Sequence, residues 1–502
     1  MAEEGAIKRI VVVGGGTAGW MTAAALSRFL GGSGRRIVLI ESEAIGTVGV
    51  GEGTIPPILE FNLQLGLDEA EFLRETHATY KLGIEFVDWT RKGERYFHQF
   101  GQIGRPLNGV PFYQLWLANR SNASVGALAG YSMSAVAAAD HRFSHPSPDP
   151  ADPLSQLAYA FHFDASAYGQ FLRRYAEAHG AERIEGKIIG TEQDGESGFI
   201  TAVRLEDDRR VRGDLFIDCS GFRSLLLGQQ LEVPFEDWSH WLPCDRAVTV
   251  GSERTTPLLP YTRSTAHSAG WQWRIPLQHR TGNGHVYCSA SMDDDEAERI
   301  LVSTLDAPAI AEPRRLRFTA GRRTKSWEAN VVAIGLSSGF LEPLESTSIH
   351  LIQHGIQKLL GLFPSRGISP VERAEYNRHM VNSYEPVRDF IIFHYLANNR
   401  EEPFWRQVRS MNLPDTLRHK IELFREHGHV FRYDDELFDI PSWAAVMLGQ
   451  GIIPAACDPL ATALPEADVL RAMAELKRAY ESAAKRLPLA SEFIERRIAA
   501  VQ

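Results

Sequence analysis

The chain has 502 residues and a formal net charge of −10, with 44% hydrophobic and 23% charged residues. This is ordinary globular composition, and the length is sufficient for two closely packed lobes. The negative charge argues against nucleic-acid binding, and no apolar run reaches the ~18 residues that suggest a membrane span.

The N-terminus and the cysteines indicate the compartment. Met1-Ala2-Glu3-Glu4 is acidic and leads straight into a predicted strand, which is not the pattern of a signal peptide. The cysteines are far apart and form no CxxC pair; they are Cys219, Cys244, Cys288 and Cys457. We therefore expect free thiols in a reducing cytoplasmic setting, and no metal site.

A βαβ unit is predicted at the start of the chain. Residues 10–13 are a β-branched run, as expected for a parallel strand that is buried on both faces. A glycine-rich turn over 14–19 and a helical stretch from 20 to about 30 follow it. A second strand over 37–40 ends on Glu41. This order is the context that makes a glycine fingerprint informative.

The turn reads Gly14-Gly15-Gly16-Thr17-Ala18-Gly19 and predicts a dinucleotide site. Gly14 allows the tight turn, Gly16 lets the backbone approach a pyrophosphate, and Gly19 permits close helix–strand packing. The helix N-terminus, with Thr17 and Ala18, faces the phosphate charge. Glu41, 22 residues after Gly19, can accept hydrogen bonds from a ribose diol.

The rest of the chain predicts a discontinuous first lobe and a helical second lobe. Residues 121–155 are rich in Ala, Ser, Pro and Gly and are expected to form a mobile surface insertion. Residues 331–334 predict another buried strand, which Gly335 ends. Ser369-Pro370-Val371-Glu372 is typical of a capped helix start. Val469, Met473, Leu476 and Tyr480 mark one face of a late helix.

We therefore expect an α/β nucleotide-binding lobe over residues 1–363, with an insertion near 100–155 that covers the substrate. A mostly helical substrate-side lobe is expected over 364–502.

Further motifs point to a flavin enzyme of one family. Asp214 to Gly221 resembles the second strand-and-glycine segment of FAD-binding monooxygenase folds. Trp271-Gln272-Trp273-Arg274-Ile275-Pro276 resembles the WxWxIP signature of the flavin-dependent tryptophan halogenases, and its two tryptophans project to one face of a strand. The same family resemblance extends, in the family's order, over Val48 to Pro56, Tyr80-Lys81-Leu82-Gly83 and Phe340 to Thr347.

The resemblance implies an enzyme that uses FADH2, oxygen and chloride or bromide to halogenate an electron-rich aromatic ring. Val50 and Gly51 would contact the flavin, and Trp271 and Trp273 would separate flavin from substrate. Lys81 would capture hypohalous acid, either by a hydrogen bond or as a haloamine. Glu345 would polarise that species or remove the ring proton.

The halide site is also implied by the resemblance. The backbone amides of Thr347 and Ser348 would bind the anion, as amides at a helix start can. Ser348 stands where the family usually has glycine. Serine keeps the backbone amide but tolerates a positive φ less well than glycine, so the sequence leaves the halide affinity and the preference between chloride and bromide open.

The substrate side is less defined. His98 and Phe100 resemble the pair that sandwiches indole in the family. Ser442 to Met447, which contains Trp443, corresponds to the region that holds free tryptophan, but it has no tyrosine pair. Because polar clamps discriminate strongly, their loss favours indoles or larger aromatic molecules over free tryptophan.

Two other functions use the same fold. An aromatic flavin monooxygenase would hydroxylate its substrate and would not need Lys81. A flavin-binding protein without catalysis would not need both Lys81 and Glu345. No nicotinamide site is evident, so the resemblance implies a separate flavin reductase as partner. The sequence leaves the oligomeric state open, with a homodimer among the alternatives.

Overall fold

The computed structural model describes residues 7–44, 51–433 and 436–500. A six-stranded sheet carries the predicted βαβ unit, with the strand order β20-β21-β12-β1-β2-β8. The five strands from β21 to β8 are parallel, and β20 pairs antiparallel at one edge. Their bounds are β1 Arg9–Val13, β2 Arg36–Glu41, β8 Glu182–Glu185, β12 Leu215–Asp218, β20 Trp327–Glu328 and β21 Val331–Ala333.

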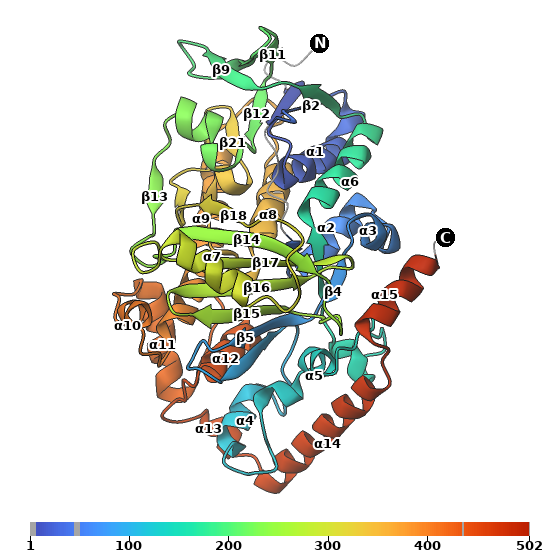
Figure 1. Ribbon diagram of the computed structural model, residues 1–502, viewed down its shortest axis with the longest axis vertical. Coiled ribbons are helices and arrows are strands. Elements are labelled where there is room, and N and C mark those ends of the chain that lie inside the picture. Colours follow the sequence, from blue (N-terminus) through green and yellow to red (C-terminus); the bar gives the residue numbers. More distant parts are fainter. Residues whose placement is uncertain (1–6, 45–50, 434–435, 501–502) are drawn as a thin grey trace.

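A seven-stranded sheet forms the middle of the molecule (Figure 1), with the order β18-β14-β17-β16-β15-β5-β6. Adjacent strands in this sheet pair antiparallel, except for β15 and β5, which are parallel. The bounds are β5 Gly83–Val87, β6 Arg95–Gln99, β14 Arg246–Glu253, β15 Thr262–His267, β16 Gly270–Pro276, β17 Arg280–Tyr287 and β18 Arg314–Arg317.

Three smaller sheets complete the strands. The first, β3-β7-β4, consists of β3 Gly51–Gly53, β7 Ala160–Asp164 and β4 Thr79–Lys81. The second contains β9 Ile188–Gln193, β10 Ile200–Leu205 and β11 Arg210–Arg212. The third contains β13 Phe235–Asp237, β19 Gly321–Arg323 and β22 Gly339–Phe340.

Helices surround these sheets. Among the described residues beyond Gly361, the chain forms helices and no strands. The earlier helices are α1 Thr17–Leu30, α2 Pro57–Leu65, α3 Glu69–Glu75, α4 Phe112–Asn119, α5 Met133–Ala139, α6 Ala165–Ala178, α7 Asp294–Ser303 and α8 Ser348–Gly361. The later ones are α9 Pro370–Leu396, α10 Pro403–Arg409, α11 Asp415–His427, α12 Ile440–Gly449, α13 Pro459–Thr462, α14 Glu466–Lys485 and α15 Ala490–Ala499.

The predicted helix signals are confirmed. Ser369 caps α9, where its hydroxyl accepts from the amide of Val371, and Glu372 completes the capping box. Val469, Met473 and Tyr480 are buried along α14, because this face packs against the body of the protein. No described helix is both long and apolar enough to cross a membrane.

The prediction of a mobile surface insertion over 121–155 is wrong for its central part. Ser132 caps α5, and Tyr131 and Met133 are fully buried. α5 contacts α14 and also β5 and β6, and Figure 1 shows α4, α5 and α14 gathered at one end of the molecule. Small residues are common here because they permit close helix packing, which composition alone does not distinguish from a loop.

Candidate functional site

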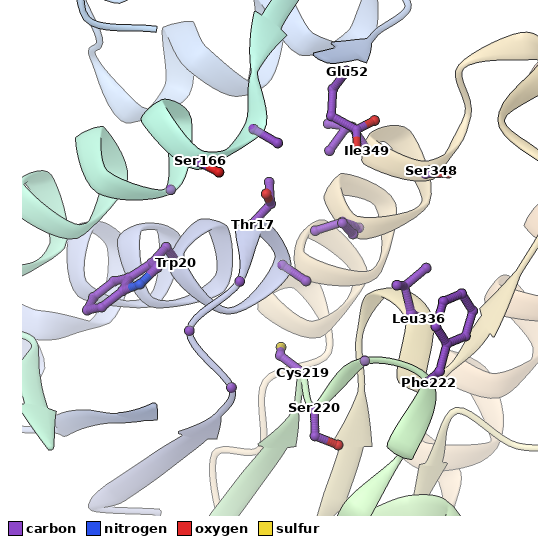
Figure 2. A pocket seen from close by; sticks show the side chains of 18 of the residues that line it. Thr17, Trp20, Glu52, Ser166, Cys219, Ser220, Phe222, Leu336, Ser348 and Ile349 are labelled. Carbon is purple, nitrogen blue, oxygen red and sulfur yellow. The ribbon is translucent and has the colours of Figure 1, made fainter. Parts of the chain in front are cut away.

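A cavity of about 800 Å³ opens where β1, β2 and β12 end. Ligands bind at this edge in open parallel sheets. In Figure 2, Thr17 from the start of α1 and Cys219 and Ser220 from the segment after β12 surround the cavity. Ser348 and Ile349 approach from α8. The volume lies within the range of small-molecule and cofactor sites.

The glycine turn has the geometry that a dinucleotide site requires. Gly14 has φ +108°, and a Cβ there would lie 2.3 Å from the carbonyl oxygen of Cys219. At Gly19 an added Cβ would lie 1.8 Å from the carbonyl oxygen of Gly14. At Gly16 an added Cβ would meet nothing within 4 Å, because this residue faces the open cavity. The space beside Gly16 is where the motif places a pyrophosphate.

Thr17 and Ala18 follow as the first residues of α1, and both line the cavity. No side chain caps this helix, so its first amides remain available for an anion. Both residues therefore lie where the sequence predicted.

Glu41 lies at the end of β2 and also lines the cavity. Its carboxylate accepts from Arg183 on β8 at 2.6 Å and from the indole nitrogen of Trp20 at 3.2 Å. These two donors fix the side chain beside the glycine turn. A ribose hydroxyl would share the carboxylate with Arg183.

The second strand-and-glycine segment joins the same cavity. β12 pairs with β1 in parallel, with Val13 opposite Asp218. The side chain of Asp218 accepts backbone amides of Leu226 and Leu227 at 2.8 and 2.9 Å, which closes the turn after the strand. Cys219 and Gly221 line the cavity. The two segments together form an extended cradle of the kind FAD needs, so the residues present fit this cofactor.

The structure describes only part of the segment that the sequence predicts to contact the flavin, Val50 and Gly51. Val50 lies outside the described residues, whereas Gly51 and Glu52 line the cavity at the start of β3. Burial raises the pKa of Glu52 to about 7. Sequence inspection placed Glu52 inside a motif without assigning it a role; nothing in its neighbours indicated that its side chain would be half-buried at the cavity.

Lys81 lies immediately behind this cavity. It ends β4, is fully buried, and donates to the hydroxyl of Ser346 at 2.7 Å. Gly53 and Ser346 line the cavity, and a Cβ on Gly53 would lie 2.8 Å from the Ser346 hydroxyl and 3.4 Å from the Lys81 amine. The sheet β3-β7-β4 produces this arrangement, because β7 pairs with the strands of both Gly53 and Lys81.

Glu345 immediately precedes Ser346. Lys81 is therefore hydrogen-bonded to the residue that follows the second predicted catalytic residue. Glu345 ends a 3-10 turn, Pro343–Glu345, and is fully buried. Its Oε2 lies 2.9 Å from Nδ1 of His98, and its Oε1 lies 2.7 Å from Nε2 of His394. His394, on α9, was missed by the sequence analysis because no local motif marks it.

Burial affects the pKa values of both Lys81 and Glu345. Loss of hydration lowers the pKa of Lys81 to about 7, although the Glu345 charge acts in the opposite direction. Burial alone would raise the pKa of Glu345, but His98 and His394 outweigh it and hold the pKa at about 2. At neutral pH the carboxylate is therefore charged, whereas a substantial share of the amine is neutral.

Trp271 and Trp273 share one face of β16, with ring centroids 5.9 Å apart. Trp273 lines the cavity. Trp271 donates to Glu342 at 2.9 Å, and burial raises the pKa of that carboxyl to about 7. Gly284, opposite Trp273 on β17, leaves room for the indole, since a Cβ there would lie 2.1 Å from a ring carbon. The tryptophans thus form a packed wall beside the cavity.

The predicted halide residues begin α8. Thr347 is its buried N-cap residue and Ser348 its first residue, and Ser348 lines the cavity. The structure answers whether serine is strained at position 348. Ser348 is helical, and the left-handed residue is Ser346, with φ +58°. Serine therefore fits position 348 without the positive φ that would favour glycine.

The predicted substrate residues are buried around Glu345 and Lys81. The Phe100 ring centroid lies 5.3 Å from the Lys81 amine. His98 contacts the ring of Phe390 at 5.5 Å, and Phe390 contacts Trp443 on α12 at 4.7 Å. The structure thus links His98 and Trp443 through Phe390 and places Phe100 beside Lys81.

Known proteins share both the sequence and the fold. The family model "Tryptophan halogenase" matches residues 9–466. Tryptophan 6-halogenase SttH from Streptomyces toxytricini is 37% identical, covering 89% of this chain and 90% of that protein.

Two solved structures are similar over nearly their whole length. Xcc4156, a flavin-dependent halogenase from Xanthomonas campestris, has TM-score 0.95 and 46% identity over 98% of both chains. BrvH, a flavin-dependent halogenase from Brevundimonas sp. BAL3, has TM-score 0.94 and 46% identity over 98% of this chain and 99% of that one. The chain belongs to the tryptophan halogenase family of flavin-dependent enzymes.

Proposed function

We propose that this enzyme uses FADH2, oxygen and chloride or bromide to halogenate an indole or a similar electron-rich aromatic ring, with Lys81 as the transfer group. The observation that carries the proposal is the position of the Lys81 amine. It is fully buried, bonded to Ser346, and separated from the cavity only by residues such as Gly53 that line it.

The cavity residues would hold FAD. Gly14, Gly16, Thr17 and their neighbours would receive the pyrophosphate, and Glu41 a ribose. Gly51 would lie against the flavin end of the site. When bound, reduced FAD supplies the two-electron chemistry that activates oxygen. The amides of Thr347 and Ser348 would hold the halide at the start of α8, which lies at the cavity.

Lys81 would take the electrophilic halogen from hypohalous acid and present it to the ring. A charge on the amine would weaken it as a nucleophile, and burial counteracts this by lowering its pKa to about 7. Glu345 stays ionised beside it, so its charge would stabilise positive charge that develops on the ring. Trp271 and Trp273 would keep the organic substrate out of the flavin chamber.

The substrate would bind between Lys81 and the aromatic region of His98, Phe100 and Trp443. An indole suits these apolar surroundings. The stretch Ser442 to Met447 offers no tyrosine pair, and the Ser442 hydroxyl already donates to Asp439 at 3.0 Å. This favours indoles over free tryptophan as substrates.

A separate flavin reductase would supply FADH2, since the sequence shows no nicotinamide site. The division at residue 363, the substrate-covering role of the insertion, the cytoplasmic location and a homodimer stay predictions.

One assay tests the proposal. The protein receives FADH2 from an added reductase, together with indole, oxygen and bromide, and the products are identified by mass spectrometry. We expect bromoindole. An oxygenated indole would instead indicate a hydroxylase, and stoichiometric flavin binding without any product would indicate a non-catalytic flavin protein.

A further inference from the structure

The buried carboxylate of Glu345 lies between two imidazole rings. Its Oε2 lies 2.9 Å from Nδ1 of His98, and its Oε1 lies 2.7 Å from Nε2 of His394. All three residues are at most 2% exposed. Oε2 of Glu345 is therefore hydrogen-bonded to His98, whereas Oε1 lies close to His394 without forming a well-aligned hydrogen bond. The pKa of the carboxyl is held at about 2, which makes Glu345 a weak proton acceptor.

The proton positions in this cluster follow from its hydrogen bonds. The hydroxyl of Tyr96 lies 2.9 Å from Nδ1 of His394, and Nε2 of the same ring faces the carboxylate of Glu345, which can only accept. We therefore assign the phenol as the donor to Nδ1. Nδ1 of His394 then accepts, which leaves the proton of a neutral ring on Nε2, facing Glu345.

The same reasoning applies to His98. An ionised carboxylate can only accept, so Nδ1 of His98 must carry the proton that it shares with Glu345. When the ring of His98 is in its neutral form, its Nε2 is an unprotonated acceptor. Among the described residues, no hydrogen bond is formed at this nitrogen.

The position of His98 suits a proton acceptor in halogen transfer. Lys81 is bonded to Ser346, and His98 is bonded to Glu345, the preceding residue. The amine that would deliver the halogen and the imidazole are thus anchored at consecutive positions of one turn. Phe390 packs against the His98 ring, with centroids 5.5 Å apart, and limits its rotation.

We propose that His98 accepts the ring proton in the final step of halogenation, and that Glu345 and His394 act as positioning residues for it. The inference rests on the proposed function and deepens it. The bond between the halogen and its carrier, the Lys81 nitrogen of a haloamine or the oxygen of hypohalous acid held by Lys81, breaks and leaves its electron pair on the carrier. The halogen bonds to a ring carbon, and the ring becomes a cation. The C–H bond of that carbon then breaks, its electron pair returns to the ring, and the proton moves to Nε2 of His98. Glu345 stabilises the resulting imidazolium through Nδ1, and the proton later passes to water.

An isotope experiment tests this role. Bromination of indole is compared with bromination of indole deuterated at every ring carbon. Rates are expressed per FADH2 oxidised, and circular dichroism verifies that each variant is folded. Wild type should show no primary isotope effect, because attack on the halogen precedes C–H cleavage. His98→Asn retains a donor near Glu345 but has no base at the Nε2 position. Its rate of product formation should fall about 100-fold, and a primary isotope effect should appear because C–H cleavage becomes the slow step.

Two variants serve as controls. Lys81→Ala should also lose product but should show no isotope effect, because it impairs halogen delivery and not proton removal. His98→Ala should regain product when free imidazole is added, which a purely stacking role for His98 would not allow.

The possible outcomes separate the two proposals. A wild-type enzyme that makes no bromoindole would overturn the proposed function and this inference with it. If wild type does make bromoindole, a loss of product in His98→Asn without an isotope effect, and no imidazole rescue of His98→Ala, would overturn the role of His98 alone. An isotope effect in Glu345→Gln with none in His98→Asn would make Glu345 the proton acceptor and would equally overturn it.

Discussion

The amine of Lys81 lies 2.7 Å from the hydroxyl of Ser346. This bond ties a lysine from β4 to the turn that carries Glu345, although the two residues are 265 positions apart in the chain. Ser346 also lines the large cavity, so it lies between the candidate flavin chamber and the buried amine. In the proposed function, halogen would pass this turn on its way from the flavin cavity to the amine of Lys81.

Gly16→Val should abolish FAD binding. Gly16 faces open cavity space, with nothing within 4 Å of an added Cβ, so a valine there would fold without a clash but fill the space of the pyrophosphate. Equilibrium titration with FAD measures the effect, and circular dichroism verifies the fold. Unchanged FAD affinity in a folded variant would refute the assignment of the nucleotide site.

Indole should be turned over faster than free tryptophan. An amino-acid substrate needs polar partners for its ammonium and carboxylate groups, and losing such partners reduces discrimination strongly. The stretch Ser442 to Met447 supplies no tyrosine pair. Competition between the two substrates, measured as the ratio of halogenated products, tests the prediction; a clear preference for tryptophan would contradict it.

Ser348→Gly should leave the ratio of bromination to chlorination within about twofold of wild type. Ser348 is the first residue of α8 and is helical, so glycine brings no conformational advantage there. The backbone amide that would bind the halide is present in both residues. Parallel assays at matched halide concentrations measure the ratio. A large shift toward chloride would show that the serine side chain or backbone does control the anion site.

Product formation per FADH2 oxidised should rise with pH through about 7. The Lys81 amine has its pKa lowered to about 7 by burial, with Glu345 acting in the opposite direction, so the neutral form grows as the pH rises. If the halogen is carried as a haloamine, the neutral fraction sets the yield, which should increase about tenfold from about pH 6 to about pH 8. A yield that falls with pH would favour capture of hypohalous acid by an ammonium hydrogen bond. Lys81→Ala, assayed at each pH, supplies the background.

The nucleotide site was predictable because its signals are local. The turn from Gly14 to Gly19 and the strand ending at Glu41 are adjacent in sequence, and the structure places them around one cavity. Lys81 and Glu345 could be named only through family resemblance. Their proximity depends on β7 and on the 3-10 turn before Ser346, which no local pattern reveals.

Other features depended on packing that the sequence does not display. His394 lies on the long helix α9 without a motif, and its role follows only from its position beside Glu345. The small residues of α5 suggested a loop because composition does not show that Met133 is buried or that α5 packs against α14. The sequence also did not show which residue of this turn is left-handed; it is Ser346, not Ser348.

The most direct test of the account is a paired measurement on Lys81→Ala with indole and bromide. Lys81 lies outside the lining of the cavity that would hold FAD, so FAD binding and the rate of FADH2 oxidation should stay nearly as in wild type. Bromoindole should fall by at least about 100-fold, because the loss of an essential transfer group typically costs several kcal/mol of transition-state stabilisation. Bromination at a near wild-type rate would show that freely diffusing hypohalous acid does the chemistry, and loss of FADH2 oxidation would place Lys81 in the flavin site; either result would contradict the account.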